Sequence, residues 1–393
     1  MKDSFYLAWK YLLYNKIRTI ILVTCITLIA VLPLSLEILL NESEHQLLSR
    51  AERTPLIVGA KGSVLDLVMN TLYFTNEAPE FISMQSSNAI DESSLALSIP
   101  IYNRFRANRF PIVGTTLDYF EFNGLQIRDG RFLALLGECV IGADVARRLG
   151  LKAGDNLIST PESIFDIAGI YPLKMNIVGV LNRSHTPDDT AVFVDLKTAW
   201  IIEGLMHGHA DLTNTGDPTV ILSRTQDSVV ANAKLVQYTE ITASNINSFH
   251  FHGDSDQYPI TAIIVVPKDH RSGTILRGRY VRDGVSEQII RPVDAIDELL
   301  QNIFRIRNVL DAVIAFVGIT TLLAMVMVFS LSFRLRQREI NTIFKLGCSR
   351  TTIVKLVGAE ITIIITLSIL TLVVLLLLMD YNSSDLVRTF FIQ

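Results

Sequence analysis

Residues 334–379 read RLRQREINTIFKLGCSRTTIVKLVGAEITIIITLSILTLVVLLLLM. The stretch opens with a basic segment and closes with an apolar run, and another apolar run, residues 309–333, comes directly before it. About 20 apolar residues cross a bilayer as a helix, so each run is predicted to span a membrane once. Basic residues accumulate in short cytoplasmic loops, so the segment between the two spans is predicted to be cytoplasmic.

This cytoplasmic segment, residues 334–350, has the pattern of an amphipathic helix. Ile340, Ile343 and Phe344 follow the i, i+3, i+4 spacing that places apolar side chains on one helical face. Gly347 is typical of a helix stop, and Ser349 is typical of the cap of the next helix. A short amphipathic helix between two spans is well placed to bind a soluble partner.

The sequence of residues 338–360 is REINTIFKLGCSRTTIVKLVGAE. It resembles the pattern (R)REIxxxxxLGxxxxxI, which lies between the second and third membrane helices of FtsX-like ABC permeases of the MacB and LolC/LolE type. The matching positions are Arg338, Glu339, Ile340, Leu346, Gly347 and Ile353. The resemblance implies that the segment is the coupling helix, which seats in a groove of a cytoplasmic ATPase. The predicted ATPase-docking site consists of Arg338, Glu339, Ile340, Ile343, Phe344, Leu346 and Gly347.

The chain, 393 residues long and 49% hydrophobic, is predicted to be an α-helical membrane protein with a large α+β extracytoplasmic domain. Three transmembrane helices are expected, the second continuing outward as a stalk. The predicted division is 1–18 cytoplasmic interfacial helix, 19–40 first span, 41–300 periplasmic domain, 301–333 stalk and second span, 334–350 coupling loop, 351–379 third span and 380–393 periplasmic tail.

The region from 41 to 300 mixes short strand patterns with helical ones, including helices over 143–149 and 229–238, which favours an α+β fold. Its segment GRFLALLGECVIGADVARRLGLKAGDNL, residues 130–157, resembles part of the MacB-type extracytoplasmic domain. That resemblance implies a periplasmic domain with a porter-like part and a smaller inserted part. The family usually has a fourth span after the third. No fourth apolar run follows residue 379, so we expect the C-terminus outside, with residues 384–391 as a short interfacial helix.

Several polar residues allow two interpretations. Glu360 lies inside the third predicted span, where a charge is costly. It is either wet near the cytoplasmic surface or part of a dimer or helix-bundle interface. His207, His209, His250 and His252 form two pairs at alternate positions, which could chelate Zn²⁺ on a strand. Histidines beside Gly208 and Gly253 are more typical of surface loops, so we expect no metal site.

The resemblance implies a permease subunit, and this subunit is expected to be non-catalytic because the sequence contains no Walker A, GxSxG or HExxH motif. ATP and Mg²⁺ would be bound by a separate cytoplasmic ATPase of the MacB/LolD type. Further expected partners are a second copy or a related permease and a periplasmic or envelope protein, but not nucleic acid, because the net charge is −4. The expected location is the inner membrane, with the N-terminus cytoplasmic.

Three functions remain open at this point. The protein could move a lipoprotein, lipid, peptide or other envelope cargo by coupling ATP hydrolysis to movement of its outer domain. It could instead, like FtsX, activate a periplasmic hydrolase without transport. A sensor without an ATPase is a third possibility, against which the coupling-helix pattern argues.

Overall fold

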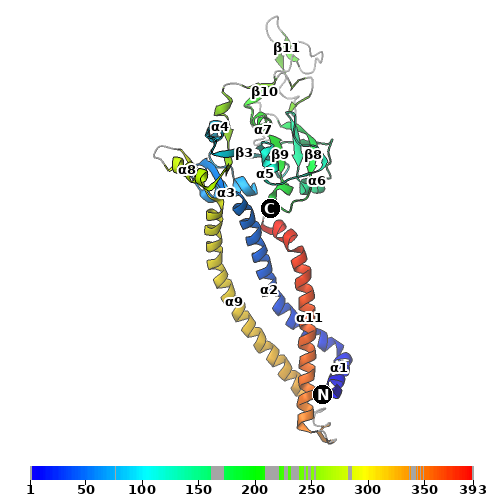
Figure 1. Ribbon diagram of the computed structural model, residues 1–393. Helices are drawn as coiled ribbons and strands as arrows, with labels where there is room; N and C mark the ends of the chain where they lie inside the picture. Colours follow the sequence, from blue (N-terminus) through cyan, green and yellow to red (C-terminus); the bar gives the residue numbers. More distant parts are fainter. Residues whose placement is uncertain are drawn as a thin grey trace. The chain divides into compact units, whose positions relative to one another are not determined.

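The computed structural model describes residues 2–391 except 76, 161–171, 209–220, 225–228, 232–238, 243–244, 247–248, 252–253, 282–285, 336, 338–341, 343, 346 and 348. The chain forms two compact units, shown in Figure 1. One contains Met1–Gln46 and Leu300–Gln393, and the other contains Leu47–Leu299.

The unit Leu47–Leu299 is built on an eleven-stranded mixed sheet with the order β13-β8-β6-β9-β4-β3-β16-β1-β17, in which β5 and β7 also pair with β8. Its strands are β1 (Leu56–Ala60), β3 (Ala96–Ala107), β4 (Phe110–Thr115), β5 (Ile127–Gly130), β6 (Glu138–Ile141), β7 (Asn156–Ile158), β8 (Leu173–Leu181), β9 (Val192–Asp195), β13 (Thr239–Glu240), β16 (Ala262–Pro267) and β17 (Glu287–Ile290).

Smaller elements complete this unit. Three two-stranded sheets pair β2 (Ile82–Ser83) with β15 (Pro259–Ile260), β10 (Met206–Gly208) with β14 (Phe249–Phe251), and β11 (Ile221–Arg224) with β12 (Val229–Ala231). The helices are α3 (Val64–Tyr73), α4 (Met84–Glu92), α5 (Asp118–Phe122), α6 (Ala143–Leu149), α7 (Leu196–Glu203), α8 (His270–Tyr280), and the 3-10 turns η1 (Pro187–Thr190) and η3 (Ser255–Gln257).

The sheet forms from β-branched runs, and its centre is buried on both faces. In β1 every residue is buried, and Ile57 pairs with Ile264 of the antiparallel strand β16. Helices lie close to these strands where glycine leaves room. A Cβ at Gly59 of β1 would lie 2.4 Å from Leu67 Cδ1 of α3, and a Cβ at Gly114 of β4 would lie 2.7 Å from Ala199 Cβ of α7.

Four helices dominate the other unit: α1 (Lys2–Tyr14), α2 (Lys16–Arg53), α9 (Pro292–Leu335) and α11 (Arg350–Phe391). The segments Lys16–Leu39 of α2 and Thr351–Tyr381 of α11 are long and apolar enough to cross a membrane. Helix α9 is continuous over the range in which the sequence predicts a stalk and a second span. The count of three spans stays a prediction.

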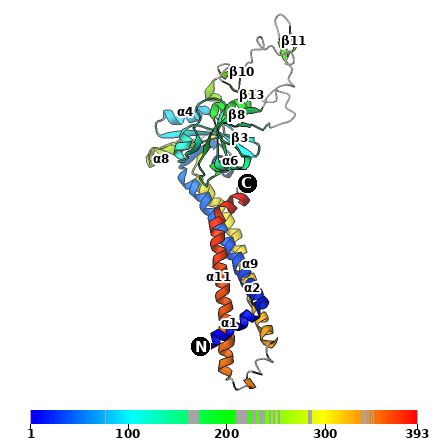
Figure 2. The same ribbon diagram turned by 90° about the vertical axis from the view of Figure 1, so that its right-hand side faces the viewer.

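Helices α1, α2 and α11 pack together through apolar side chains, and Figure 2 shows α1 lying against α11. Leu12 of α1, Leu22 and Val23 of α2, and Ile364 of α11 form a small buried cluster. The hydroxyl oxygens of Thr27 and Thr371 are hydrogen-bonded at 2.9 Å between α2 and α11. Such paired hydroxyls satisfy polar groups within a helix bundle.

The apolar part of α2, Lys16–Leu39, closely matches the predicted first span 19–40, and the helix continues to Arg53 because neither glycine nor proline interrupts residues 34–53. Two sequence predictions need correction. Residues 384–391 are the end of α11, which also contains no helix-breaking residue after Gly358. The expected helix over 229–238 is wrong at its start, where Val229–Ala231 form strand β12 and pair with β11; residues 232–238 lie outside the described residues.

Gly124 and Gly130 both have positive φ, but only Gly130 lacks space for a Cβ atom. Comparing alanine substitutions at the two positions therefore distinguishes the cost of the backbone conformation from the cost of a steric clash. Gly124 has φ +63° with open space at its Cβ position, whereas Gly130 has φ +84° and a Cβ there would lie 2.1 Å from the carbonyl oxygen of Val178. We predict that Gly124→Ala lowers unfolding free energy by about 1–2 kcal/mol, the cost of a left-handed residue.

Gly130→Ala should lower stability further, because strand β5 must also shift away from β8. Thermal unfolding of the full-length variants in detergent, followed by near-ultraviolet circular dichroism, checks the order. Equal losses for the two variants would show that the close approach at Gly130 is readily relaxed.

Candidate functional site: a buried anchor for the end of helix α2

The last two turns of α2 belong to the α+β unit rather than to the helical one. Arg50 lies in this segment, and its side chain is only 5% exposed. Ala51 and Thr54 beside it are also buried, and the Thr54 hydroxyl donates to the carbonyl oxygen of Arg50 at 3.1 Å. A charged side chain this deep requires a charged partner.

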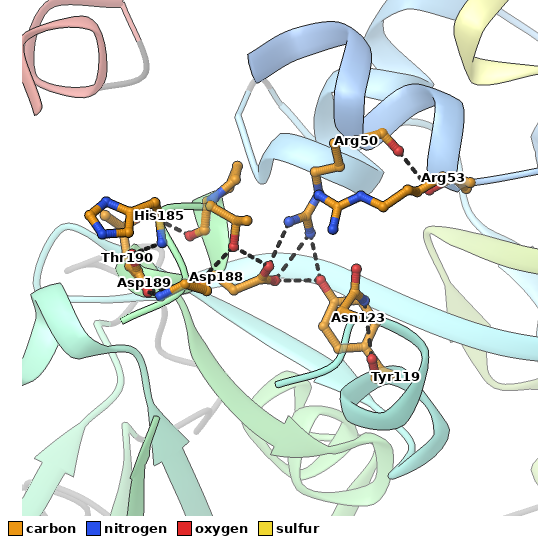
Figure 3. A network of polar contacts seen from close by, with 12 residues as sticks. Arg50, Arg53, Tyr119, Asn123, His185, Asp188, Asp189 and Thr190 are labelled. Atoms are coloured by element: carbon orange, nitrogen blue, oxygen red, sulfur yellow. Dashed lines mark hydrogen bonds and ion pairs between the residues drawn. The ribbon is translucent and has the colours of Figure 1, made fainter. Parts of the chain in front are cut away.

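That partner is Asp188, as Figure 3 shows. Arg50 Nη1 donates to Asp188 Oδ2 at 2.6 Å, and Nη2 donates to Asp188 Oδ1 at 3.1 Å. Tyr119 of α5 closes a triangle: its hydroxyl accepts from Arg50 Nη2 at 2.7 Å and donates to Asp188 Oδ1 at 2.6 Å. The pair is therefore bidentate, the strong geometry for arginine and a carboxylate.

The turn η1 holds Asp188 in place. The Thr186 hydroxyl donates to Asp188 Oδ2 at 2.6 Å, and the neighbouring Asp189 accepts from the backbone N–H groups of Ser184 and His185 at 2.8 and 2.9 Å. A Cβ at Gly142, just before α6, would lie 2.3 Å from the carbonyl oxygen of Asp188. The acceptor is thus held by contacts that do not involve Arg50.

Aromatic rings line the other side of the arginine. The guanidinium carbon lies 5.5 Å from the ring centroid of Phe74, which follows α3, so a cation–π contact adds to the ion pair. Phe193 of β9 packs against Phe74 and Tyr119 with centroid distances of 6.1 and 5.4 Å. The Tyr73 hydroxyl donates to the carbonyl oxygen of Leu47, which ties α2 to α3 one turn before Arg50.

Electrostatics favour the charged form of both partners. Burial alone would raise the pKa of Asp188, but the positive charge of Arg50, with hydrogen bonds from Arg50, Thr186 and Tyr119, holds it below its ordinary value. Burial alone would lower the pKa of Arg50, yet the Asp188 charge raises it overall. Burial is also the main reason that the pKa of Tyr119 is raised well above its ordinary value, so its hydroxyl remains a donor.

Helix α9 begins in the same α+β unit, and its first turns contain buried apolar residues. Strand β17 pairs with β1 and leads directly into Pro292, where the helix begins. Proline suits this first position. Ala295 and Ile296 are buried, and Arg291 forms an ion pair with Asp294 at 3.4 Å. The first turn of α9 is therefore packed into the unit.

The predicted ATPase-docking site lies mostly outside the described residues, which exclude Arg338, Glu339, Ile340, Ile343 and Leu346. Phe344 is 47% exposed, as a docking side chain must be. Gly347 has φ +97°, the conformation expected of a helix stop. Ser349 accepts from the backbone N–H of Thr352 at 3.2 Å, so the predicted cap of α11 is confirmed. The role of these residues stays a prediction.

Glu360 lies on α11 and is 8% exposed, beside the buried Ala359. Its role at a dimer or helix-bundle interface stays a prediction. For the histidines, His207 of β10 pairs in register with His250 of β14, while His209 and His252 lie outside the described residues. No group of three or more His, Cys, Asp or Glu that could hold a metal occurs among the described residues.

Residues 51–237 match the MacB-like periplasmic core domain. The match covers the anchor residues Tyr119 and Asp188 and ends before strand β13. The α+β unit therefore contains a domain of this class. The match agrees with the sequence resemblance of residues 130–157 to a MacB-type extracytoplasmic domain, and two helices of the chain are long and apolar enough to cross a membrane.

Solved structures that the chain matches include the periplasmic region of MacB from Actinobacillus actinomycetemcomitans, at 11% identity and TM-score 0.35, covering 63% of this chain and 93% of that one. The extracellular domain of the noncanonic ABC-type transporter YknZ from Gram-positive bacteria matches at 9% identity and TM-score 0.33, covering 60% and 98%. No curated protein sequence matches the chain.

Sequence reasoning missed the anchor. Arg50 and Asp188 are 138 positions apart, and neither stands in a motif. The sequence offers two weak signals: Arg50 lies near the end of a helical pattern that no glycine or proline interrupts, and Asp188 lies in the turn-forming sequence TPDDT. The structure shows that Ala51, next to Arg50, is buried. These patterns could have suggested a buried arginine, but not its partner.

A double-mutant cycle tests the anchor. We predict that Arg50→Met and Asp188→Leu each lower unfolding free energy by about 3–5 kcal/mol, because each leaves a buried charge without its partner. The double variant should lose much less than the sum. Chemical unfolding of the full-length protein in detergent measures all three, and additive losses would contradict a coupled pair.

The exposed pair Lys174 and Glu240, 2.8 Å apart, is the matched control and should contribute less than about 1 kcal/mol. The pH dependence gives a second check. Because the pKa of Asp188 is lowered on folding from 3.8, its stabilising effect is full above that value and disappears as pH falls through the folded-state pKa. Asp188→Leu should remove that part of the acid sensitivity.

Proposed function

We propose that this chain is the membrane subunit of an ABC system, in which its long helices convert ATP-driven movement of a cytoplasmic ATPase into movement of the MacB-like domain. The observation that carries the proposal is that α2 and α9 each contribute residues to both units as uninterrupted helices. At 1.5 Å per residue, 38 and 44 residues give lengths of about 57 and 66 Å. Both exceed the roughly 30 Å of a bilayer core.

The two helices are held by different means at their outer ends. The end of α2 is fixed by the Arg50–Asp188 ion pair, and the start of α9 by its apolar first turn and by β17. Strand β17 is the edge strand of the sheet and pairs with β1, which in turn pairs with β16, so a pull on α9 acts directly on this edge of the sheet. A displacement of either helix therefore reaches the core instead of being absorbed in a loop.

At the cytoplasmic side, the amphipathic segment 334–350 would bind the ATPase. It follows α9 directly and precedes α11, whose start is capped by Ser349. When two ATPase copies close on ATP, docked segments of two permease chains would approach each other and tilt their α9 helices. This mechanism needs no polar path across the membrane.

The movement has two candidate uses. It could expel a lipoprotein, lipid, peptide or other cargo on the outer side, or it could activate an envelope hydrolase. Mechanical transmission is common to both. The partners are a MacB/LolD-type ATPase, a second permease chain and an outer-side protein or cargo, and ATP and Mg²⁺ are bound by the ATPase.

Phe344→Asp tests the docking site. The side chain is exposed on the proposed docking face, and a carboxylate there would have to lose water on binding. We predict that co-purified ATPase falls at least about tenfold, while the variant stays in the membrane fraction. Phe5→Asp, an equally exposed phenylalanine on α1, is the control and should retain the ATPase. Full retention with Phe344→Asp would exclude this face as the docking site.

A second test addresses the stiffness of α9. Four glycines inserted after Gln301 would make a flexible joint, whereas four alanines would extend the helix by about one turn and rotate its ends by only about 40°. We predict that tetraglycine abolishes the ATP-dependent change in hydrogen exchange of the MacB-like domain, and that tetra-alanine largely preserves it.

ATPase binding should survive both insertions, because segment 334–350 is unchanged. A tetraglycine variant that still transmits the ATP-dependent change would show that α9 is not the lever. Loss of ATPase binding in the tetra-alanine variant would instead show damage to the helical unit.

A further inference from the structure

The turn between α1 and α2 forms a groove with unusual chemistry. Helix α1 ends at Tyr14 and α2 begins at Lys16, so Asn15 alone joins them. The groove has a volume of about 600 Å³, and its walls include Tyr14, Lys16, Ile17, Arg18 and Ile21. Two cations and three apolar or aromatic side chains thus share one hollow, and all of it lies within the helical unit.

The turn itself is rigid. The backbone N–H of Asn15 donates to the carbonyl oxygen of Tyr11 at 3.0 Å, and that of Thr19 donates to Asn15 at 3.1 Å. The Thr19 hydroxyl also contacts the carbonyl oxygens of Leu12 and Asn15, both at 3.1 Å. The helical hydrogen bonds therefore continue around the bend, and the positions of Lys16 and Arg18 are set by it.

Arg18 is poorly satisfied in its present position. Its Nη1 makes one long hydrogen bond of 3.4 Å to the Tyr11 hydroxyl, and its Nη2 is buried with no hydrogen-bond partner among the described residues. An unpaired buried donor costs free energy. If the guanidinium turned into the groove, only the long hydrogen bond to Tyr11 would be lost, and an anion there could accept hydrogen bonds from both nitrogens.

The surroundings favour an anion that also has an apolar part. The sequence contains no Asp or Glu between residues 4 and 36, but it has Lys10, Lys16 and Arg18. Around the groove, Ile17 is 79% exposed, Tyr14 87% and Ile21 56%. Free phosphate would satisfy the cations and leave these apolar surfaces uncovered. Lys16 also begins the segment Lys16–Leu39 that can cross a membrane, so the cations lie at its end, where lipid headgroups would be.

We propose that this groove binds one anionic phospholipid, with the phosphate between Lys16 and Arg18 and an acyl chain along Ile17 and Ile21. Guanidinium and ammonium groups are the usual phosphate ligands, and arginine can bind two phosphate oxygens at once. The lipid would fix the bend at headgroup level and hold α1 along the membrane surface, where its exposed Phe5, Tyr6 and Trp9 are stable.

Native mass spectrometry of the full-length protein in detergent tests the proposal, with dioleoyl phosphatidylglycerol and dioleoyl phosphatidylcholine as competing probes. We expect one phosphatidylglycerol to be retained in preference to phosphatidylcholine. Lys16→Gln and Arg18→Gln should each weaken phosphatidylglycerol binding about fivefold, which corresponds to about 1 kcal/mol per cation at a membrane surface.

Lys10→Gln is the matched control. Lys10 is also an exposed cation of this region, but it lies 5.7 Å from the ring centroid of Tyr6 and not in the groove wall, so this variant should bind like the wild type. Arg18→Lys should restore part of the affinity. If Arg18→Gln fails to fold, Lys16→Gln still decides, because Lys16 is exposed and substitutions at exposed positions usually change stability little.

Three results would overturn the proposal. Equal loss with Lys10→Gln would mean unspecific attraction to a basic surface. Equal retention of both lipids would mean an apolar groove without headgroup recognition. Inorganic phosphate that displaces phosphatidylglycerol at millimolar concentration would mean a site for the free anion.

Discussion

The buried ion pair between Arg50 and Asp188 is the constraint on which the α+β unit depends at its junction with α2. Two opposite charges away from water are stable only together and in good geometry, and here Tyr119 and Thr186 add hydrogen bonds to the Asp188 carboxylate, while Arg50 Nε has no hydrogen-bond partner among the described residues. Such a pair contributes less net stability than apolar packing would, but it tolerates displacement poorly. The end of α2 can therefore move only if the turn η1 and the sheet behind it move as well.

The sequence predicted what depends on local pattern. Apolar runs predicted the helices around Lys16–Leu39 and Thr351–Tyr381, and the α+β character of the outer region followed from short β-branched runs; the match to the MacB-like domain confirms its class. Helix α6 occupies its expected residues 143–149, because Gly142 and Gly150 bound it on both sides. Each of these features is encoded within a few neighbouring residues.

What the sequence did not reveal depends on contacts between distant residues. Val229–Ala231 has a helical pattern in isolation, but strand β11 provides a partner that outweighs a local preference. The anchor joins residues 50, 119 and 188, and no spacing rule connects them. The end of α2 at Arg53 was missed for a related reason: residues 41–53 are too polar for a membrane span, yet the α+β unit supports the helix by burying Arg50 and Ala51.

The two ends of α2 then follow one physical logic. The buried Arg50 forms an ion pair with Asp188, so this end of the helix is fixed to the MacB-like domain. At Arg18 a half-buried cation has one weak partner and an adjacent groove, and the acidic group that would complete it is absent from the neighbouring sequence. With the proposed lipid bound at the Arg18 end and the ion pair at the Arg50 end, α2 would be able to tilt but not to slide along its own axis. Tilting is the motion that mechanical transmission requires, and the placement of one arginine near each end of α2 is what would select it.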